Sequence, residues 1–208
     1  MELQLVKSLV VNPDGSLPEI PHCLYAYILA GNGVFVYARR SGLEALIPVA
    51  ACTMTGLPGL TPWMRIAQRV PARLLEKALR FCQQVFPSEA LIWFNRTDTW
   101  SIHIPDQQVT NASAVPCDRH DLAGTRALID LHSHARLSAF FSPTDDRDET
   151  GFRLYAVLGN LHGEPTITMR VGIYSHYFNF PASTVFELPD GMRDIYKKEE
   201  VEHETKQG

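Results

Sequence analysis

The feature that most limits the fold is a change near Pro71 in the spacing of apolar residues, from short strand-like runs to the repeat of a helix. From there to Pro87, apolar residues recur at helical spacing, with one proline suited to the first turn and the other closing the run. The apolar runs elsewhere are short and bounded by turn residues. In "LYAYILAGNGVFVYARR", for example, Gly31-Asn32-Gly33 separates two predicted strands of a hairpin. One clear amphipathic helix among many strands predicts an α+β fold.

The same patterns predict three parts along the chain. Residues 1–66 form an N-terminal, mostly β module with a further strand at "EALIPVA", and the Gly- and Pro-rich residues 53–64 link this module to the next. Residues 67–190 form a second domain that contains the helix, a hairpin around "RTDT", a loop at "NASAVPCDRHDLAGTR" and further strands. Residues 191–208 form a charged tail. A chain of 208 residues without a repeated βα pattern is not a (β/α)8 barrel.

Net charge and the distribution of apolar residues argue against nucleic-acid and membrane partners, and the cysteines indicate the compartment. The formal net charge of -4 leaves no basic excess to neutralise phosphates, so nucleic acid is not expected as a partner. About 18 consecutive apolar residues would be needed to cross a membrane, and the sequence has no such run. The four cysteines are widely spread and form no CxxC pair, which favours reduced thiols. We therefore predict a cytoplasmic protein that does not bind membranes.

The strongest chemical motif is "HSHARLSAFFSPTD", residues 132–145. On a strand, His132 and His134 point to the same face while Ser133 faces away. Two imidazoles aimed at one point are two ligands of a mononuclear site. A catalytic zinc usually takes three protein ligands and leaves a fourth position for water, and Asp145 is the candidate for the third ligand.

The end of this motif also has a purely structural interpretation. Ser142-Pro143-Thr144-Asp145 has the pattern of an N-cap serine, a proline at the first helical position and an acid at the third. The two interpretations are compatible, because a helix cap fixes the backbone and can point an aspartate toward a metal. Asp146 and Asp148 remain competing candidates for the third ligand, and a pair of histidines alone is a weak signal.

Taken together, His132-Ser133-His134, Ser142 and Asp145 reproduce the pattern HxH-x7-S-x2-D. In this pattern the chain resembles the JAB/MPN (JAMM) metalloprotease family, over roughly residues 70 to 190. The resemblance implies a cytidine-deaminase-like α/β/α sandwich, zinc on the two histidines and Asp145, and a hydrogen bond from Ser142 to the oxyanion of the transition state. The sequence departs from the family at Ala135, where many members have proline.

The family also has a glutamate on the strand after its first helix, and "FPSEALIWF" places Glu89 there, although the glycine that often follows is missing. A carboxylate beside a zinc-activated water can take the water's proton, because zinc lowers the pKa of that water toward about 7. The resemblance therefore implies that Glu89 is the general base. The alternatives are that Glu89 is an ordinary surface residue at the start of a strand, or that Glu76 within the helix replaces it.

The length, the N-terminal β module and "SHARLSAFFSPTDDRDE" resemble the PRTRC system protein A subgroup of this family. Proteins of that subgroup belong to plasmid-borne bacterial cassettes with a ThiF-like (E1-like) activating enzyme and a small ubiquitin-like protein. The resemblance implies a zinc-dependent isopeptidase or peptidase that acts on the extended C-terminal tail of a ubiquitin-like protein. The alternative is a non-enzymatic MPN-type scaffold or binding module in the same kind of cassette. The filled motif positions favour the enzyme.

Overall fold

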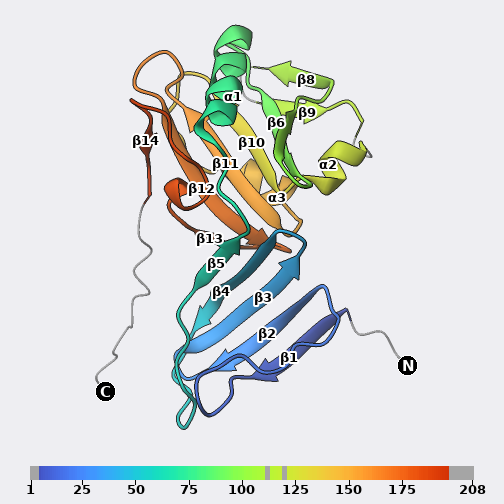
Figure 1. The fold of residues 1–208 in the computed structure, drawn as a ribbon. Coiled ribbons are helices and arrows are strands. Elements are labelled where there is room, and N and C mark those ends of the chain that lie inside the picture. The colour runs from blue at the N-terminus through green and yellow to red at the C-terminus, as the bar shows by residue number, and fades with distance from the viewer. Residues whose placement is uncertain (1–4, 111–112, 119–120, 197–208) are drawn as a thin grey trace.

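The computed structural model describes residues 5–110, 113–118 and 121–196, which form two large sheets and a two-stranded ribbon (Figure 1). The first sheet has the strand order β1-β2-β3-β4-β5. Its strands are β1 (Val6–Val10), β2 (Tyr25–Ala30), β3 (Gly33–Arg40), β4 (Leu43–Ala51) and β5 (Trp63–Ile66). The predicted hairpin is confirmed as β2 and β3, and the predicted strand at "EALIPVA" as β4.

The segment predicted to link the two modules instead folds back on the β2–β3 turn. The amide of Gly31 donates to the carbonyl of Pro58 at 2.7 Å, and the side chain of Asn32 bonds both backbone groups of Leu60 at 2.8 Å. A Cβ atom at position 31 would lie 2.1 Å from the Leu57 carbonyl oxygen, so this approach requires glycine. The prediction of a linker is wrong because Gly and Pro mark turns without showing where they pack.

The second sheet has the strand order β13-β12-β11-β10-β6-β7, with β14 beside β12. Only the β10–β11 and β12–β14 pairs are parallel within it. The protein is thus α+β and mostly sheet. The strands are β6 (Leu91–Arg96), β7 (Trp100–His103), β10 (Ile129–His134), β11 (Arg153–Gly159), β12 (Thr166–Ile173), β13 (His176–Asn179) and β14 (Arg193–Asp194).

Helix α1 (Ala72–Val85) confirms the predicted helix and covers one face of the second sheet. Its buried residues Leu75, Ala78 and Cys82 share a core with Leu131 of β10 and with Ile47 of the first sheet. Alternate side chains of β10 therefore belong to this core. Because successive side chains of a strand point to opposite faces, the side chains of Asp130, His132 and His134 are directed to the other side of the sheet.

The region predicted as a loop contains ordered elements that cover this other side. It holds β9 (Ser113–Pro116), which pairs with β8 (Gln107–Thr110), and the short helix α2 (Leu122–Arg126). The side-chain amide of Gln107 accepts from the Leu91 amide at 2.7 Å and donates to the Leu91 carbonyl at 3.1 Å. A single side chain thus takes the place of a strand partner and holds the β8–β9 ribbon against β6. The remaining helices are α3 (Pro143–Asp148) and the 3-10 helix η1 (Ala182–Thr184).

The first residues of the predicted tail belong to the second sheet. Arg193 and Asp194 pair in parallel with Thr166 and Ile167 of β12, so the ordered chain continues past position 191. The rest of the predicted tail, residues 197–208, lies outside the described residues. Among the described residues, no helix is long and apolar enough to cross a membrane.

Candidate metal centre

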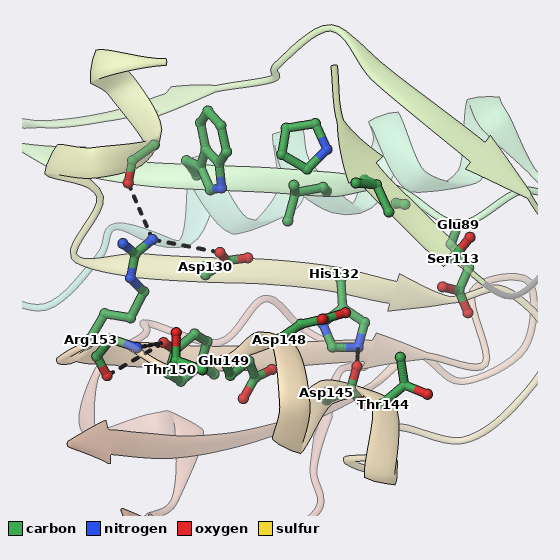
Figure 2. Close-up of a pocket in the computed structure, with 18 of the residues that line it drawn as sticks. Glu89, Ser113, Asp130, His132, Thr144, Asp145, Asp148, Glu149, Thr150 and Arg153 are labelled. Atoms are coloured by element: carbon green, nitrogen blue, oxygen red, sulfur yellow. Dashed lines mark hydrogen bonds and ion pairs between the residues drawn. The ribbon is translucent and has the colours of Figure 1, made fainter. Parts of the chain in front are cut away.

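Three predicted ligands meet at the end of β10. The ligand atoms of His132, His134 and Asp145 all lie within 4.8 Å of one another. The two Nε2 atoms of the histidines are 3.2 Å apart. The Nε2 of His132 is 3.4 Å from the Oδ1 of Asp145 (Figure 2). The two histidines lie on one face of β10, and Asp145 lies in the first turn of α3. The fold therefore brings together ligands that are eleven residues apart in sequence.

The start of α3 satisfies both interpretations of its sequence. The Oγ of Ser142 accepts a hydrogen bond from the Asp145 amide at 3.3 Å, and the Ser142 amide donates to the Oδ2 of Asp145. This capping box, with Pro143 in the first turn, fixes the aspartate carboxylate. Its other oxygen, Oδ1, is left facing His132. The helix cap therefore orients the third ligand.

The competing carboxylates are not part of this group. Asp146 accepts from Arg170 and keeps 53 % of its side chain exposed. Asp148 lines the nearby cleft but is not one of the three converging residues. Glu76, the alternative to Glu89 as the base, lies on α1, pairs with Arg80 at 3.6 Å and is not among the residues that line the cleft. Of the candidate third ligands, the structure brings Asp145 to the histidines.

The electrostatic state of the histidines suits a metal. Burial lowers the pKa of both imidazoles, that of His132 to about 4, so both are neutral at pH 7 with a lone pair available. The ring of Phe140 packs edge-on against His134 at 4.6 Å between centroids. Two neutral imidazoles and a carboxylate are a donor set that zinc accepts readily in a three-ligand site. The three residues therefore fit a divalent metal such as zinc.

Glu89 lies in the same cleft as the histidines (Figure 2) and is only 9 % exposed, so its interpretation as an ordinary surface residue is wrong. Its amide donates to the Thr110 carbonyl at 2.9 Å, which ties it to the β8–β9 ribbon. The next residue, Ala90, donates to the Oγ of Ser133 at 3.0 Å, and the Ser133 amide donates back to Ala90. The serine between the two histidines therefore fixes the position of Glu89 relative to them.

Burial, and secondarily the charge of Asp145, raises the pKa of Glu89 from 4.5 to about 7. A carboxyl whose pKa is raised by folding destabilises the folded state once it ionises, so the metal-free protein should lose stability as the pH rises from about 4.5 to 7. We expect metal-free Glu89→Gln to be more stable than wild type by about 2 kcal/mol at pH 8, with no advantage at pH 4. Urea unfolding with a chelator present measures this difference. A variant less stable than wild type at pH 8 contradicts it.

The metal ligands form one end of a cleft of about 460 Å³. The polar face of β10 lines it, together with β9, α2 and α3. At the end opposite Glu89, Asp130 lies beside Arg153 (Figure 2), with 3.7 Å between Oδ2 and Nη1. Burial raises the pKa of Asp130 to about 6. The other lining residues include Trp93, Ser113, Ala114, Val115, Pro116, Gly124, Thr125, Thr144, Glu149, Gly151 and Tyr155.

Sequence reasoning missed the far end of this cleft. One signal was available for Asp130, because it stands two residues before His132 and therefore shares its strand face. Trp93 and Arg153 come from other strands, and no local pattern places them near the histidines. Only the pairing of β6 and β11 with β10 brings them there.

The loop between the histidines and Ser142 depends on Gly159 of β11. A Cβ atom there would lie 2.2 Å from the Ala139 nitrogen and 2.5 Å from the Leu137 carbonyl oxygen. Because these are backbone atoms, we expect Gly159→Ala to displace the loop and to lower the free energy of unfolding by about 1–3 kcal/mol. Urea unfolding measures this loss. Gly151→Ala is the matched control, since its Cβ would meet nothing closer than 3.5 Å, and an equal effect in both variants would contradict the explanation.

Comparisons with known proteins give no family. No protein-family model matches the chain, and no curated protein is similar to it in sequence. Among solved structures, the chain is similar to the solution structure of protein DSY2949 from Desulfitobacterium hafniense, with a TM-score of 0.40 and 15% sequence identity. That similarity covers 59% of this chain and 93% of the other. We therefore base the proposed function on the residues of the cleft.

Proposed function

We propose that the protein is a zinc-dependent peptidase or isopeptidase of the JAB/MPN type that cleaves the C-terminal tail of a ubiquitin-like protein. One observation carries the proposal: three potential metal ligands converge in a cleft that also holds a buried glutamate. An ion pair with a purely structural role needs neither the third ligand nor the cleft, whereas metal-dependent hydrolysis of an amide needs three ligands for the metal and a cleft for the substrate.

The residues divide the chemistry between them. A zinc ion held by His132, His134 and Asp145 would polarise the scissile carbonyl and make water more acidic. Glu89 takes the proton of the attacking water and delivers it to the leaving amine; its raised pKa, about 7 before a metal binds, suits both transfers. The hydroxyl of Ser142 accepts from the Asp145 amide, so its own proton is free to be donated to the oxyanion.

The cleft favours an extended substrate. Strand β9 pairs with β8 along one edge, and its residues Ser113–Pro116 line the cleft. An extended tail that lies along β9 would be recognised mainly through its backbone, which favours small residues beside the scissile bond. A ubiquitin-like protein with a glycine-containing C-terminus meets this requirement. We further propose that an E1-like protein is a partner, as the resemblance to the PRTRC system protein A subgroup implies. The four free cysteines agree with action in a reducing compartment such as the cytoplasm.

The proposal is tested with a ubiquitin-like protein that carries a C-terminal reporter, incubated with the purified protein with and without a zinc chelator. Mass spectrometry should find cleavage at the glycine-containing tail, lost on chelation and restored by zinc. Unfolded casein should be cleaved much more slowly. Tight binding of the ubiquitin-like protein without cleavage would favour the non-enzymatic scaffold, and equal cleavage of casein would overturn the assignment of the substrate.

Ser133→Ala should lower activity without lowering zinc content, because Ser133 positions Glu89 and is not itself a metal ligand. The change removes the hydroxyl that accepts from Ala90 and so loosens Glu89 relative to the histidines. We expect kcat to fall by about tenfold or more, because small displacements of a catalytic group are costly, while zinc content stays unchanged. Ser133→Thr keeps the hydroxyl and should recover part of the loss. If Ser133→Ala loses its zinc, the serine supports the ligands rather than the base.

A further inference from the structure

Helix α3 and its flanking residues, the α3 segment (residues 141–149), carry both Ser142 and Asp145 but have no apolar helix face that packs on the sheet. The helix has six residues, and within the described structure none of them is buried. A helix this short is not stable by itself, because most helical stability in proteins comes from the packing of an apolar face. The capping box shapes the first turn, but both of its partners belong to the segment itself. Contacts of another kind must therefore place the segment beside the histidines.

The contacts that tie α3 to the sheet converge on Arg170 of β12. Its Nε donates to the Oε2 of Glu149 at 2.8 Å, and its Nη2 donates to the same oxygen. Its Nη1 donates to the Oδ1 of Asp146, the residue that follows Asp145. Glu149 is the C-cap residue of α3, and its amide donates to the Asp145 carbonyl at 2.9 Å. One guanidinium thus holds both ends of the turn that follows the third ligand.

Two aromatic rings fix this guanidinium in turn. The Cζ of Arg170 lies 4.0 Å from the ring centre of Phe141 and 3.9 Å from that of Tyr177 on β13. Phe141 directly precedes the N-cap of α3, so the stack also holds the start of the segment. The hydroxyl of Tyr177 lies 2.9 Å from the carbonyl of Asp146 and 2.6 Å from that of Glu149, and it donates to these last carbonyls of the helix.

The guanidinium and its main partner are both buried. The side chain of Arg170 is 6 % exposed and that of Glu149 is 9 % exposed. A buried ion pair adds little net stability over a well-packed apolar pair, but the planar fork of a guanidinium fixes the direction of its partners. The residues that line the cleft in the described structure do not include Arg170, Phe141 or Tyr177. Their effect on the metal centre is therefore indirect.

We propose that Arg170 is a positioning residue of the metal centre. Together with Phe141 and Tyr177 it forms a clamp that fixes the α3 segment against the sheet. The segment in turn presents Asp145 to the metal and Ser142 to the oxyanion. The inference rests on the proposed function for the role of Ser142, and on the metal centre alone for the role of Asp145. Groups that orient metal ligands typically contribute about 10–100-fold to metal affinity or activity.

The test measures the zinc affinity of the folded protein, which a residue needed only for stability would leave unchanged. Zinc is titrated against a competing chelator, and urea unfolding of the metal-free protein records stability separately. Arg170→Lys keeps a positive charge but loses the fork and the flat surface for stacking, so we expect zinc binding to weaken by about tenfold. Tyr177→Phe removes only the hydroxyl and should weaken zinc binding by about threefold.

A double variant removes the clamp without leaving a buried charge unpaired. Arg170→Met combined with Glu149→Gln replaces the ion pair by neutral side chains of similar size, so the protein should fold. We expect this variant to lose at least as much zinc affinity as Arg170→Lys. At saturating zinc, kcat should fall in all three variants with little change in KM, because the Ser142 hydroxyl acts in the transition state.

Arg65→Lys is the matched control. Arg65 also stacks on an aromatic ring, that of Trp63 at 4.4 Å, and pairs with Glu44 at 3.6 Å, but it lies on the first sheet. This variant should bind zinc as wild type does. If Arg170→Lys does not fold, Tyr177→Phe and the double variant decide in its place.

Wild-type zinc affinity in the folded clamp variants overturns the inference, whatever their stability, and so does an absence of zinc binding by wild type. The proposed function fails separately. If the clamp variants lose zinc affinity as expected but wild type cleaves no ubiquitin-like tail, the positioning of Asp145 stands and the peptidase assignment falls.

Discussion

The Glu89→Gln protein is expected to keep its zinc and to lose cleavage activity by about a hundredfold or more, the usual contribution of a positioned general base. The amide is nearly the size of the carboxyl but cannot accept the proton of water. Glu89 is buried and held in place by the bond from its amide to the Thr110 carbonyl and by the bond from the Ala90 amide to Ser133. Steady-state kinetics and metal analysis on the same preparation measure both properties.

The control is Glu76→Gln, the same substitution at an exposed position on α1. It should retain wild-type activity and metal content. If Glu89→Gln loses its zinc, Glu89 is a ligand or a structural residue, and if it retains full activity, the base lies elsewhere.

His132→Ala is expected to abolish stoichiometric zinc binding and, with it, all chelator-sensitive cleavage. The remaining pair of ligands is too few to hold a catalytic zinc, which needs three. The thermal stabilisation that wild type gains from added zinc should also disappear, since only a ligand that binds the folded state raises its stability. Mass spectrometry under native conditions and thermal unfolding with and without zinc measure these effects.

His22→Ala is the control, because His22 is exposed and distant in sequence from the motif. It should bind one zinc per chain, as wild type should. Near-stoichiometric zinc in a protein that lacks both His132 and His134 would show that the metal centre is misassigned.

The local features of this protein could be predicted from its sequence. The helix at Ala72–Val85 follows from a helical repeat closed by prolines, and the hairpin at Gly33 follows from its turn residues. The pairing of His132 with His134 on one face follows from the period of a strand, and the capping of α3 follows from Ser142 and Asp145. Each of these depends on residues within a few positions of one another.

Features that depend on long-range packing could not be predicted in this way. Residues 53–64 were predicted as a linker, yet this segment packs on the turn at Gly31 and ends in the first residues of β5. The segment predicted as a loop contains β9 and α2, which help to form the cleft. Composition shows that a segment turns but not which distant backbone it meets.

The candidate site likewise combines residues that local sequence predicts with residues that only the tertiary structure places. The sequence by itself determined the metal-ligand candidates, because the spacing of His132, His134 and Asp145 is local and specific. Only the tertiary structure decided that Glu89 is buried beside them, through the bond from Ala90 to Ser133, and that Trp93 faces Asp130. Both depend on the antiparallel register of β6 against β10, which is set by the burial of a common core rather than by any short stretch of sequence.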